Sequence, residues 1–141
     1  MSDSRLLVAV SSPWASQKFV GPIVDLARRL DAQILVAHVT HPQDEDEDEA
    51  SATARGEETL KLLTEALRDE GVRAEPIMLF GDDVAKAILN TAKARHCTLI
   101  VLGWTGKSLW KRLFAADVPE NIIRQSDLPV LLCPASWSGQ V

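Results

Sequence analysis

The sequence has few cysteines, no long apolar run and no excess of basic residues, and each absence excludes a class of protein. Cys97 and Cys133 lie in or beside apolar strand-like runs, which favours buried reduced thiols over a disulfide. No apolar run approaches the roughly 20 residues that span a bilayer, and the stretch MSDSRLLVAV lacks the pattern of a signal peptide. A formal net charge of -5 argues against a broad nucleic-acid surface. We therefore expect a cytoplasmic protein with no membrane insertion and no nucleic-acid partner.

The residues that are present form an ordinary globular mixture, 46% hydrophobic and 25% charged, in a chain that suits one domain over residues 1–141. Short apolar runs alternate with longer stretches of helical spacing. The runs lie at residues 5–11, 33–39, 72–80, 97–103 and 128–134. This alternation predicts an α/β fold, a parallel sheet with helices on both faces. The run 97–103 is the most apolar and predicts a central strand, whereas Pro76 predicts that 72–80 is an edge strand.

The stretches between the strands predict helices and one acidic loop. Pro22 interrupts the first helical stretch, so we expect a kink or a fresh helix start there. Asp82 is the expected N-cap of the third helix. The second helix has the apolar stripe Leu60, Leu63 and Leu67. Six consecutive acids at 44–49 predict a solvated, flexible loop over about 41–56, and the alternative is a contact with a cation or a partner.

The fourth apolar run is followed by a glycine-containing loop in LGWTGKSLWKRLFAADVPENI, residues 102–122. Gly103 and Gly106 permit positive φ angles and let a ligand approach the backbone closely. Loop amides next to a helix N-terminus form an anion site, and Lys107 adds positive charge. Ligands of open parallel sheets bind beyond the carboxyl ends of the strands. The loop is therefore a candidate phosphate site, and the alternative is a tight turn that uses glycine for local reasons alone.

Several motifs together resemble those of the universal stress protein family, over nearly all of residues 4–134. They are LVAHV in the second strand, GDDVAKAILNTA at the third helix, TLIVLG before the glycine pair and SDLPVLLCP at the end. The resemblance implies a Rossmann-like, adenine nucleotide alpha hydrolase-like sheet of five parallel strands in the order 3-2-1-4-5. It also implies a homodimer joined through the last strand, which here contains Val130, Leu131 and Leu132, and in some members ATP binding. The Gly-Trp after the fourth strand is similar to that of stress-protein domains that work with membrane transporters.

The sequence departs from the motif of the ATP-binding members, G-x2-G-x9-G-[S/T]. Gly103 and Gly106 match its first half, but Ala116 and Asp117 stand where the motif has glycine and a hydroxyl residue. Asp117 also suits the N-cap of a helix that starts with DVPE, and its carboxylate would then accept the amides that a phosphate needs. The alternative is a cation that bridges Asp117 to a nucleotide.

Two further positions follow from the resemblance. The family tends to place an aspartate that contacts the nucleotide at the end of the first strand, where this chain has Ser11. Val39 matches a residue that contacts adenine through its backbone. The adenine part of the site is thus retained, while polar anchors for the rest of the nucleotide are changed.

We therefore predict a non-enzymatic regulatory domain for the stress response, with a degenerate nucleotide site and weak or absent ATP binding. One alternative is a sensor that binds ATP or AMP, with Mg²⁺, through Val39, Gly103, Gly106 and Lys107. The other is a cytoplasmic regulatory module of a membrane transporter or another protein, with the loop tryptophans on its contact surface.

The sequence predicts neither a catalytic residue nor a metal ligand. No Gly-x-Ser-x-Gly turn surrounds Ser11, and no histidine is placed beside it by sequence. His38 and His41 are three apart across a strand end, and a metal site there would need further ligands.

Overall fold

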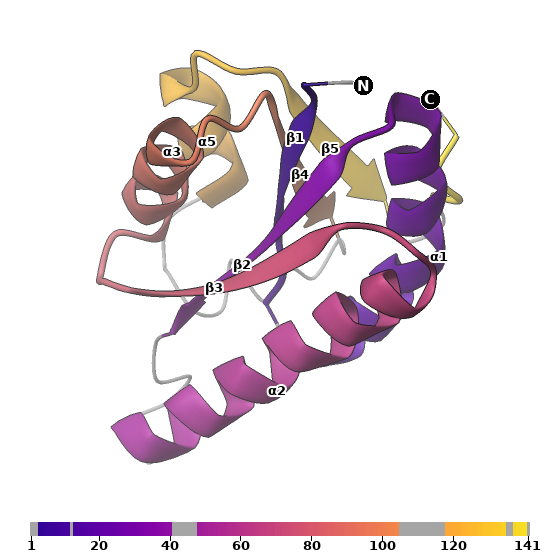
Figure 1. Ribbon diagram of the computed structural model, residues 1–141. Helices are drawn as coiled ribbons and strands as arrows, with labels where there is room; N and C mark the ends of the chain where they lie inside the picture. Colours follow the sequence, from indigo (N-terminus) through magenta and orange to yellow (C-terminus); the bar gives the residue numbers. More distant parts are fainter. Residues whose placement is uncertain (1–2, 12, 41–47, 105–117, 135–136, 141) are drawn as a thin grey trace.

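The five strands form one parallel sheet in the order β3-β2-β1-β4-β5 (Figure 1). The computed structural model describes residues 3–11, 13–40, 48–104, 118–134 and 137–140. Its strands are β1 (Arg5–Ala9), β2 (Gln33–Thr40), β3 (Ala74–Phe80), β4 (Leu99–Trp104) and β5 (Val130–Pro134). The predicted α/β fold and strand order are confirmed.

Among the described residues, two helices cover each face of the sheet (Figure 1). The helices α1 (Pro13–Leu30) and α2 (Glu49–Asp69) pack on one face, and α3 (Val84–Ala94) and α5 (Val118–Gln125) pack on the other. Leu6 and Val8 of β1 face the first pair, whereas Leu7 faces the second, because side chains alternate along a strand. Both faces of β1 are buried, which explains its unbroken apolar sequence. None of the described helices is long and apolar enough to cross a lipid bilayer.

The first residues of helix α2 lie where the sequence predicted a loop. It begins at Glu49, so the prediction of a loop as far as residue 56 is wrong from residue 49 onward. Asp48 is its N-cap and accepts a hydrogen bond of 2.7 Å from the Ser51 amide. A carboxylate at this position satisfies an amide that the helix leaves unpaired, and it interacts favourably with the helix dipole. The acidic run therefore ends in a helix cap, while residues 41–47 lie outside the described residues.

Three smaller expectations also change. Strand β1, not β4, occupies the centre of the sheet, and β4 lies between β1 and β5. Pro22 lies inside the continuous helix α1, so the prediction of a fresh helix start is wrong. The N-cap of α3 is Asp83, whose carboxylate accepts a hydrogen bond of 3.1 Å from the Lys86 amide, one residue later than expected. Strand β3, with Pro76, is an edge strand as predicted.

The two cysteines are free thiols buried on opposite faces of the sheet, as the sequence predicted. Cys133 packs with the α1 and α2 layer, and Cys97 packs with the α3 and α5 layer. Burial raises the pKa of the Cys133 thiol to about 12 and also raises the pKa of Cys97. Because the thiolate is the reactive form, neither sulfur is a candidate nucleophile.

Candidate functional site

Three of the predicted site residues meet at the carboxyl edge of the central strands. The pairing of β1 ends where Ala9 meets Ala37 of β2 and Leu102 of β4, so Ser11 and Val39 each lie two residues beyond it and Gly103 lies one residue beyond it. Ser11 is partly buried just beyond β1, and Val39 is buried in the layer that faces α3 and α5. The fold thus brings these residues together where open α/β sheets bind their ligands.

The remaining predicted site residues lie outside the described residues, so their roles stay predictions. They are Gly106, Lys107, Ala116 and Asp117. Helix α5 begins at Val118, the residue after Asp117, with Pro119 in its first turn. A helix therefore starts where the DVPE sequence predicts one. The capping role of Asp117 is not tested by this.

Gly103 in β4 allows Phe19 of helix α1 to pack closely against the strand. A Cβ atom added to Gly103 would lie 2.4 Å from Cζ of Phe19, a buried residue of α1. The backbone of Gly103 does not have a positive φ angle. Gly103 continues the strand and so does not use the positive φ that glycine permits. The close approach that its missing side chain permits is made by a phenyl ring of the protein itself.

A buried histidine beneath the edge links β2 to the end of β1. His38 is 4% exposed, and its Nδ1 donates a hydrogen bond of 2.8 Å to the Val10 carbonyl oxygen, next to Ser11. Helix α2 passes directly over the ring, since a Cβ added to Gly56 would lie 2.8 Å from the His38 Cδ2. Nε2 has no hydrogen-bond partner among the described residues. His38 therefore fixes the strand end that carries Ser11.

Burial sets the charge state of His38. Loss of hydration holds its pKa below the ordinary histidine value, and the positive charge of Arg55 acts in the same direction. The hydrogen bond to the Val10 carbonyl opposes both effects. The neutral ring with its proton on Nδ1 is the form that fits this environment. His41 is outside the described residues, and within the described ranges no three His, Cys, Asp or Glu side chains are grouped to hold a metal ion.

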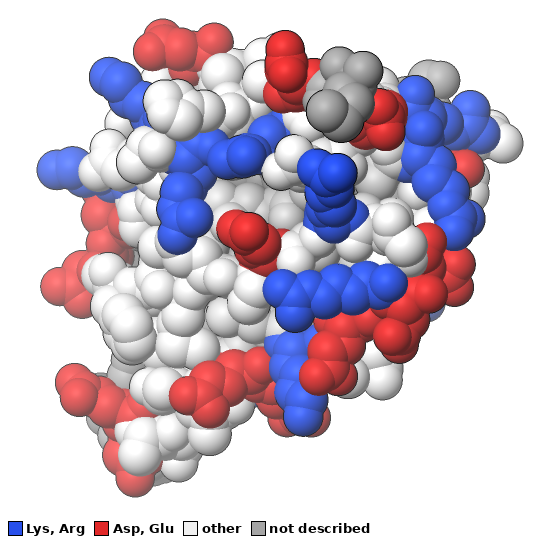
Figure 2. All heavy atoms as spheres, in the orientation of Figure 1, with Lys and Arg blue, Asp and Glu red and all other residues white. Residues whose placement is uncertain are grey.

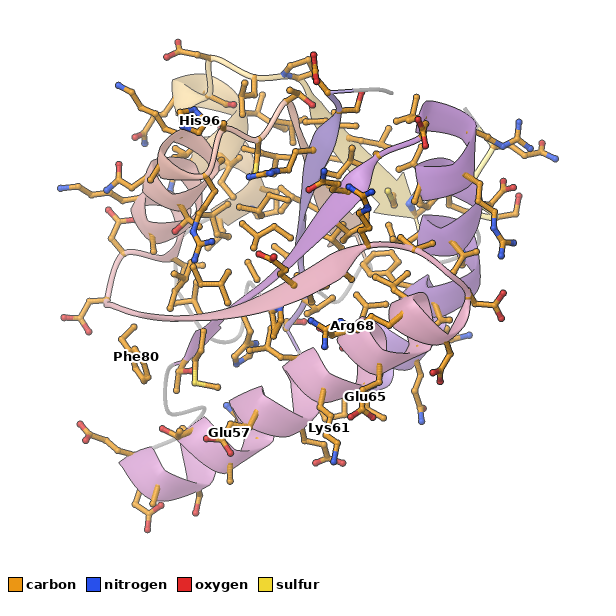
Figure 3. All side chains as sticks on the ribbon, in the orientation of Figure 1. Glu57, Lys61, Glu65, Arg68, Phe80 and His96 are labelled. Carbon is orange, nitrogen blue, oxygen red and sulfur yellow. The ribbon has the colours of Figure 1, made fainter. Side chains whose placement is uncertain are left out.

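A hollow of about 240 Å³ lies at the same edge, between the ends of β2 and β3 and the start of α2. Thr40 lines it, and its buried hydroxyl oxygen has no hydrogen-bond partner among the described residues. Phe80 also lines it, is 68% exposed, and projects from the end of β3 (Figure 3). Sequence reasoning missed both residues. The aromatic residue directly before Gly81-Asp82 at a strand end was the available signal.

The comparisons with known proteins agree with this architecture. The universal stress protein family matches residues 4–134. Universal stress protein YxiE of Bacillus subtilis is 29% identical over 147 residues, which cover 92% of this chain and 97% of that protein. The Na(+)/H(+) antiporter NhaS5 of Synechocystis is 34% identical over 82 residues, which cover 57% of this chain but 12% of the antiporter.

A solved structure extends the likeness to three dimensions. The universal stress protein from Archaeoglobus fulgidus in complex with dAMP superposes with a TM-score of 0.69 at 21% identity, covering 94% of this chain and 98% of that one. At this identity the likeness shows the fold. Together with the family match over nearly the whole sequence, it establishes that the chain belongs to the universal stress protein family.

Proposed function

We propose that this chain is a regulatory, non-catalytic stress-response domain whose nucleotide site is degenerate, so that ATP or AMP binds weakly or not at all. The observation that carries the proposal is Ser11, which lies at the carboxyl edge beside β2 and β4. The resemblance places an aspartate there in nucleotide-binding members. A serine hydroxyl accepts a weaker hydrogen bond than a carboxylate does, because charge-assisted bonds are roughly twice as strong as neutral ones.

The negative charge of Asp117 also supports the proposal of weak or absent nucleotide binding. Asp117 stands where the motif has a hydroxyl that donates to phosphate. A carboxylate about 4 Å from one phosphate charge opposes binding by roughly 1 kcal/mol in bulk water and 4 kcal/mol at an effective dielectric constant near 20. ATP carries several such charges. Binding then requires either that Asp117 points away from the phosphates or that a cation lies between them.

Calorimetry tests this proposal on the unmodified protein. We expect no heat of binding with AMP or with ATP and Mg²⁺, corresponding to a Kd weaker than about 1 mM. A circular dichroism spectrum of the same sample confirms that the protein is folded. A micromolar Kd for either nucleotide would overturn the proposal.

A working nucleotide sensor is the second candidate. The likeness to a protein solved with dAMP favours it, as does the hollow beside Thr40 at the same edge. This candidate requires Gly106, whose substitution by aspartate would place a new carboxylate in the phosphate loop. It therefore predicts a measurable AMP affinity that Gly106→Asp abolishes.

A module of a membrane transporter is the third candidate, favoured by the match to one segment of the antiporter NhaS5. The sequence predicts that its contact surface includes Trp104, the last residue of β4, and Trp110, which lies outside the described residues. This candidate predicts that Trp104→Ala and Trp110→Ala each weaken binding to the transporter while leaving the fold intact.

We also propose that the protein is a homodimer joined through β5. This strand lies at one edge of the sheet, and its half-buried residues Val130, Leu131 and Leu132 leave apolar surface for a second copy. Light scattering at micromolar concentrations should give the mass of a dimer, and Leu132→Lys should give a monomer. Phe80→Lys, which adds the same charge at the opposite edge, is the control and should remain dimeric. A monomeric wild type would contradict the proposal.

A further inference from the structure

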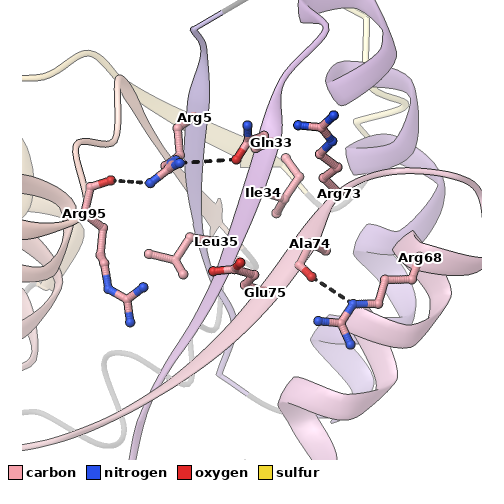
Figure 4. A pocket seen from close by; sticks show the side chains of 9 residues that line it. All are labelled: Arg5, Gln33, Ile34, Leu35, Arg68, Arg73, Ala74, Glu75 and Arg95. Atoms are coloured by element: carbon pink, nitrogen blue, oxygen red, sulfur yellow. Dashed lines mark hydrogen bonds between the residues drawn. The ribbon is translucent and has the colours of Figure 1, made fainter.

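Four arginines line a pocket at the amino edge of the sheet, opposite the candidate nucleotide site. The pocket has a volume of about 380 Å³. Its arginines come from four separate elements: Arg5 begins β1, Arg68 is in the last turn of α2, Arg73 precedes β3, and Arg95 caps the end of α3 (Figure 4). Figure 2 shows basic side chains across the middle and upper part of this face, with acidic side chains at its top and along its lower border. A chain with net charge -5 thus concentrates positive charge here.

Ion pairs do not account for this cluster. Among the described residues, the four pocket arginines form no salt bridge, whereas Arg28, Arg29 and Arg124 each pair with a carboxylate. Basic residues at helix ends are common because they offset the helix dipole. That explanation covers Arg68 and Arg95 but not the two arginines that come from strand starts.

Hydrogen bonds to neutral groups hold two of the guanidinium groups in place. Arg5 donates through Nη1 to the Arg95 carbonyl oxygen at 2.9 Å and through Nη2 to the Gln33 Oε1 at 3.2 Å (Figure 4). Arg68 donates through Nε to the Ala74 carbonyl oxygen at 2.9 Å. A guanidinium has five N–H donors, so each of these groups keeps several for a ligand. The anchoring bonds reduce the side-chain entropy that a ligand would otherwise have to remove.

The other two arginines are uncommitted. The side chains of Arg73 and Arg95 are exposed and make no hydrogen bond with any described residue. Glu75 lies among the four arginines and is the single acidic residue that lines the pocket (Figure 4). The lining therefore has a net charge of +3, and a carboxylate in its middle can accept a hydrogen bond from a ligand hydroxyl.

We propose that this pocket binds a phosphate-bearing small molecule, at a site separate from the nucleotide site. Guanidinium forks match phosphate oxygens bidentately, and a phosphate dianion presents enough oxygens for more than one arginine. The volume lies within the usual range of small-molecule pockets, and Leu35 adds an apolar wall. The pocket contains neither Ser11 nor the glycine loop. Whether the protein binds a nucleotide at the opposite edge therefore does not test the proposal for this pocket.

Calorimetry with inorganic pyrophosphate at low ionic strength tests the pocket. We expect one site per chain, with affinity falling about tenfold or more in Arg73→Gln and in Arg95→Gln, because each loses a charge-assisted hydrogen bond. Glu75→Gln removes the one negative charge and should raise the pyrophosphate affinity. Arg124→Gln is the matched control, since it removes an arginine of α5 that lies outside the pocket, and it should leave the affinity unchanged.

A titration with ribose 5-phosphate distinguishes a sugar phosphate from an inorganic phosphate as the ligand of the pocket. Tighter binding than that of pyrophosphate, reduced in Glu75→Gln, would assign the pocket to a sugar phosphate whose hydroxyl contacts Glu75. Tighter binding of pyrophosphate would assign it to inorganic phosphates. Absence of pyrophosphate binding to the folded wild type, or equal affinities for wild type, Arg73→Gln and Arg95→Gln, would overturn the proposal.

Discussion

Gly103→Ala is expected to lower the free energy of unfolding by about 1–3 kcal/mol, the usual cost of overpacking a core. The added methyl carbon would lie 2.4 Å from Cζ and 2.8 Å from Cε2 of Phe19, so the ring or the backbone must move. Phe19 is buried in the core cluster between α1, α2 and the sheet, so a shift of its ring disturbs packed neighbours. Urea denaturation of wild type and variant, followed by circular dichroism, measures the difference.

Two further variants show whether the clash is the cause. In Phe19→Leu/Gly103→Ala the smaller side chain makes room for the methyl group, so the double variant should lose less stability than the sum of the single losses. Gly21→Ala is the glycine control, because nothing lies within 4 Å of its added Cβ. Strict additivity of the two core substitutions would show that Phe19 and Gly103 do not interact.

Acidification below about pH 6.5, the ordinary pKa of histidine, is expected to destabilise the protein through His38. The folded-state pKa of His38 is lowered, so the unfolded chain binds a proton that the folded chain does not. This contribution to stability is complete above pH 6.5 and is lost as the pH falls through the lowered pKa of the folded state. The slope for one proton is about 1.4 kcal/mol per pH unit.

The physical reason lies in the two ring nitrogens. Nδ1 already donates to the Val10 carbonyl oxygen, and a proton on Nε2 would add a buried donor without an acceptor among the described residues. Urea denaturation between pH 7.5 and 5.5 measures the slope. The slope should decrease in His38→Gln and persist in His96→Asn, which replaces an exposed histidine at a positive φ with a residue that tolerates it. An unchanged slope in His38→Gln would assign the pH dependence to other groups.

Most of the fold followed from periodicity and from the resemblance. Continuous apolar runs such as that around Leu7 predict strands buried on both faces, and Pro76 correctly marked an edge strand. The start of α2 was not predictable in the same way, because an acidic run suits both a solvated loop and a helix N-terminus. The Asp48 carboxylate bonded to the Ser51 amide decides between them.

The site was predicted only in part, because its contacts join residues far apart in the sequence. Ser11, Val39 and Gly103 lie at one edge of the sheet, as the strand order implies, and their role in binding stays a prediction. The role of Gly103 depends on Phe19 in another element, and that of His38 depends on Val10 and Gly56. No local pattern carries such information. The arginine pocket was missed for the same reason, since its four basic residues are scattered between positions 5 and 95.

The most direct test of the degenerate nucleotide site is calorimetry of AMP and of ATP with Mg²⁺ on wild type and on Ser11→Asp/Ala116→Gly/Asp117→Ser. The triple variant restores the polar anchors of the ATP-binding motif and removes the opposing carboxylate. We predict no detectable binding by the wild type and micromolar binding by the triple variant. Micromolar binding by the wild type, or a folded triple variant that still binds nothing, would contradict the claim that these three residues closed the site.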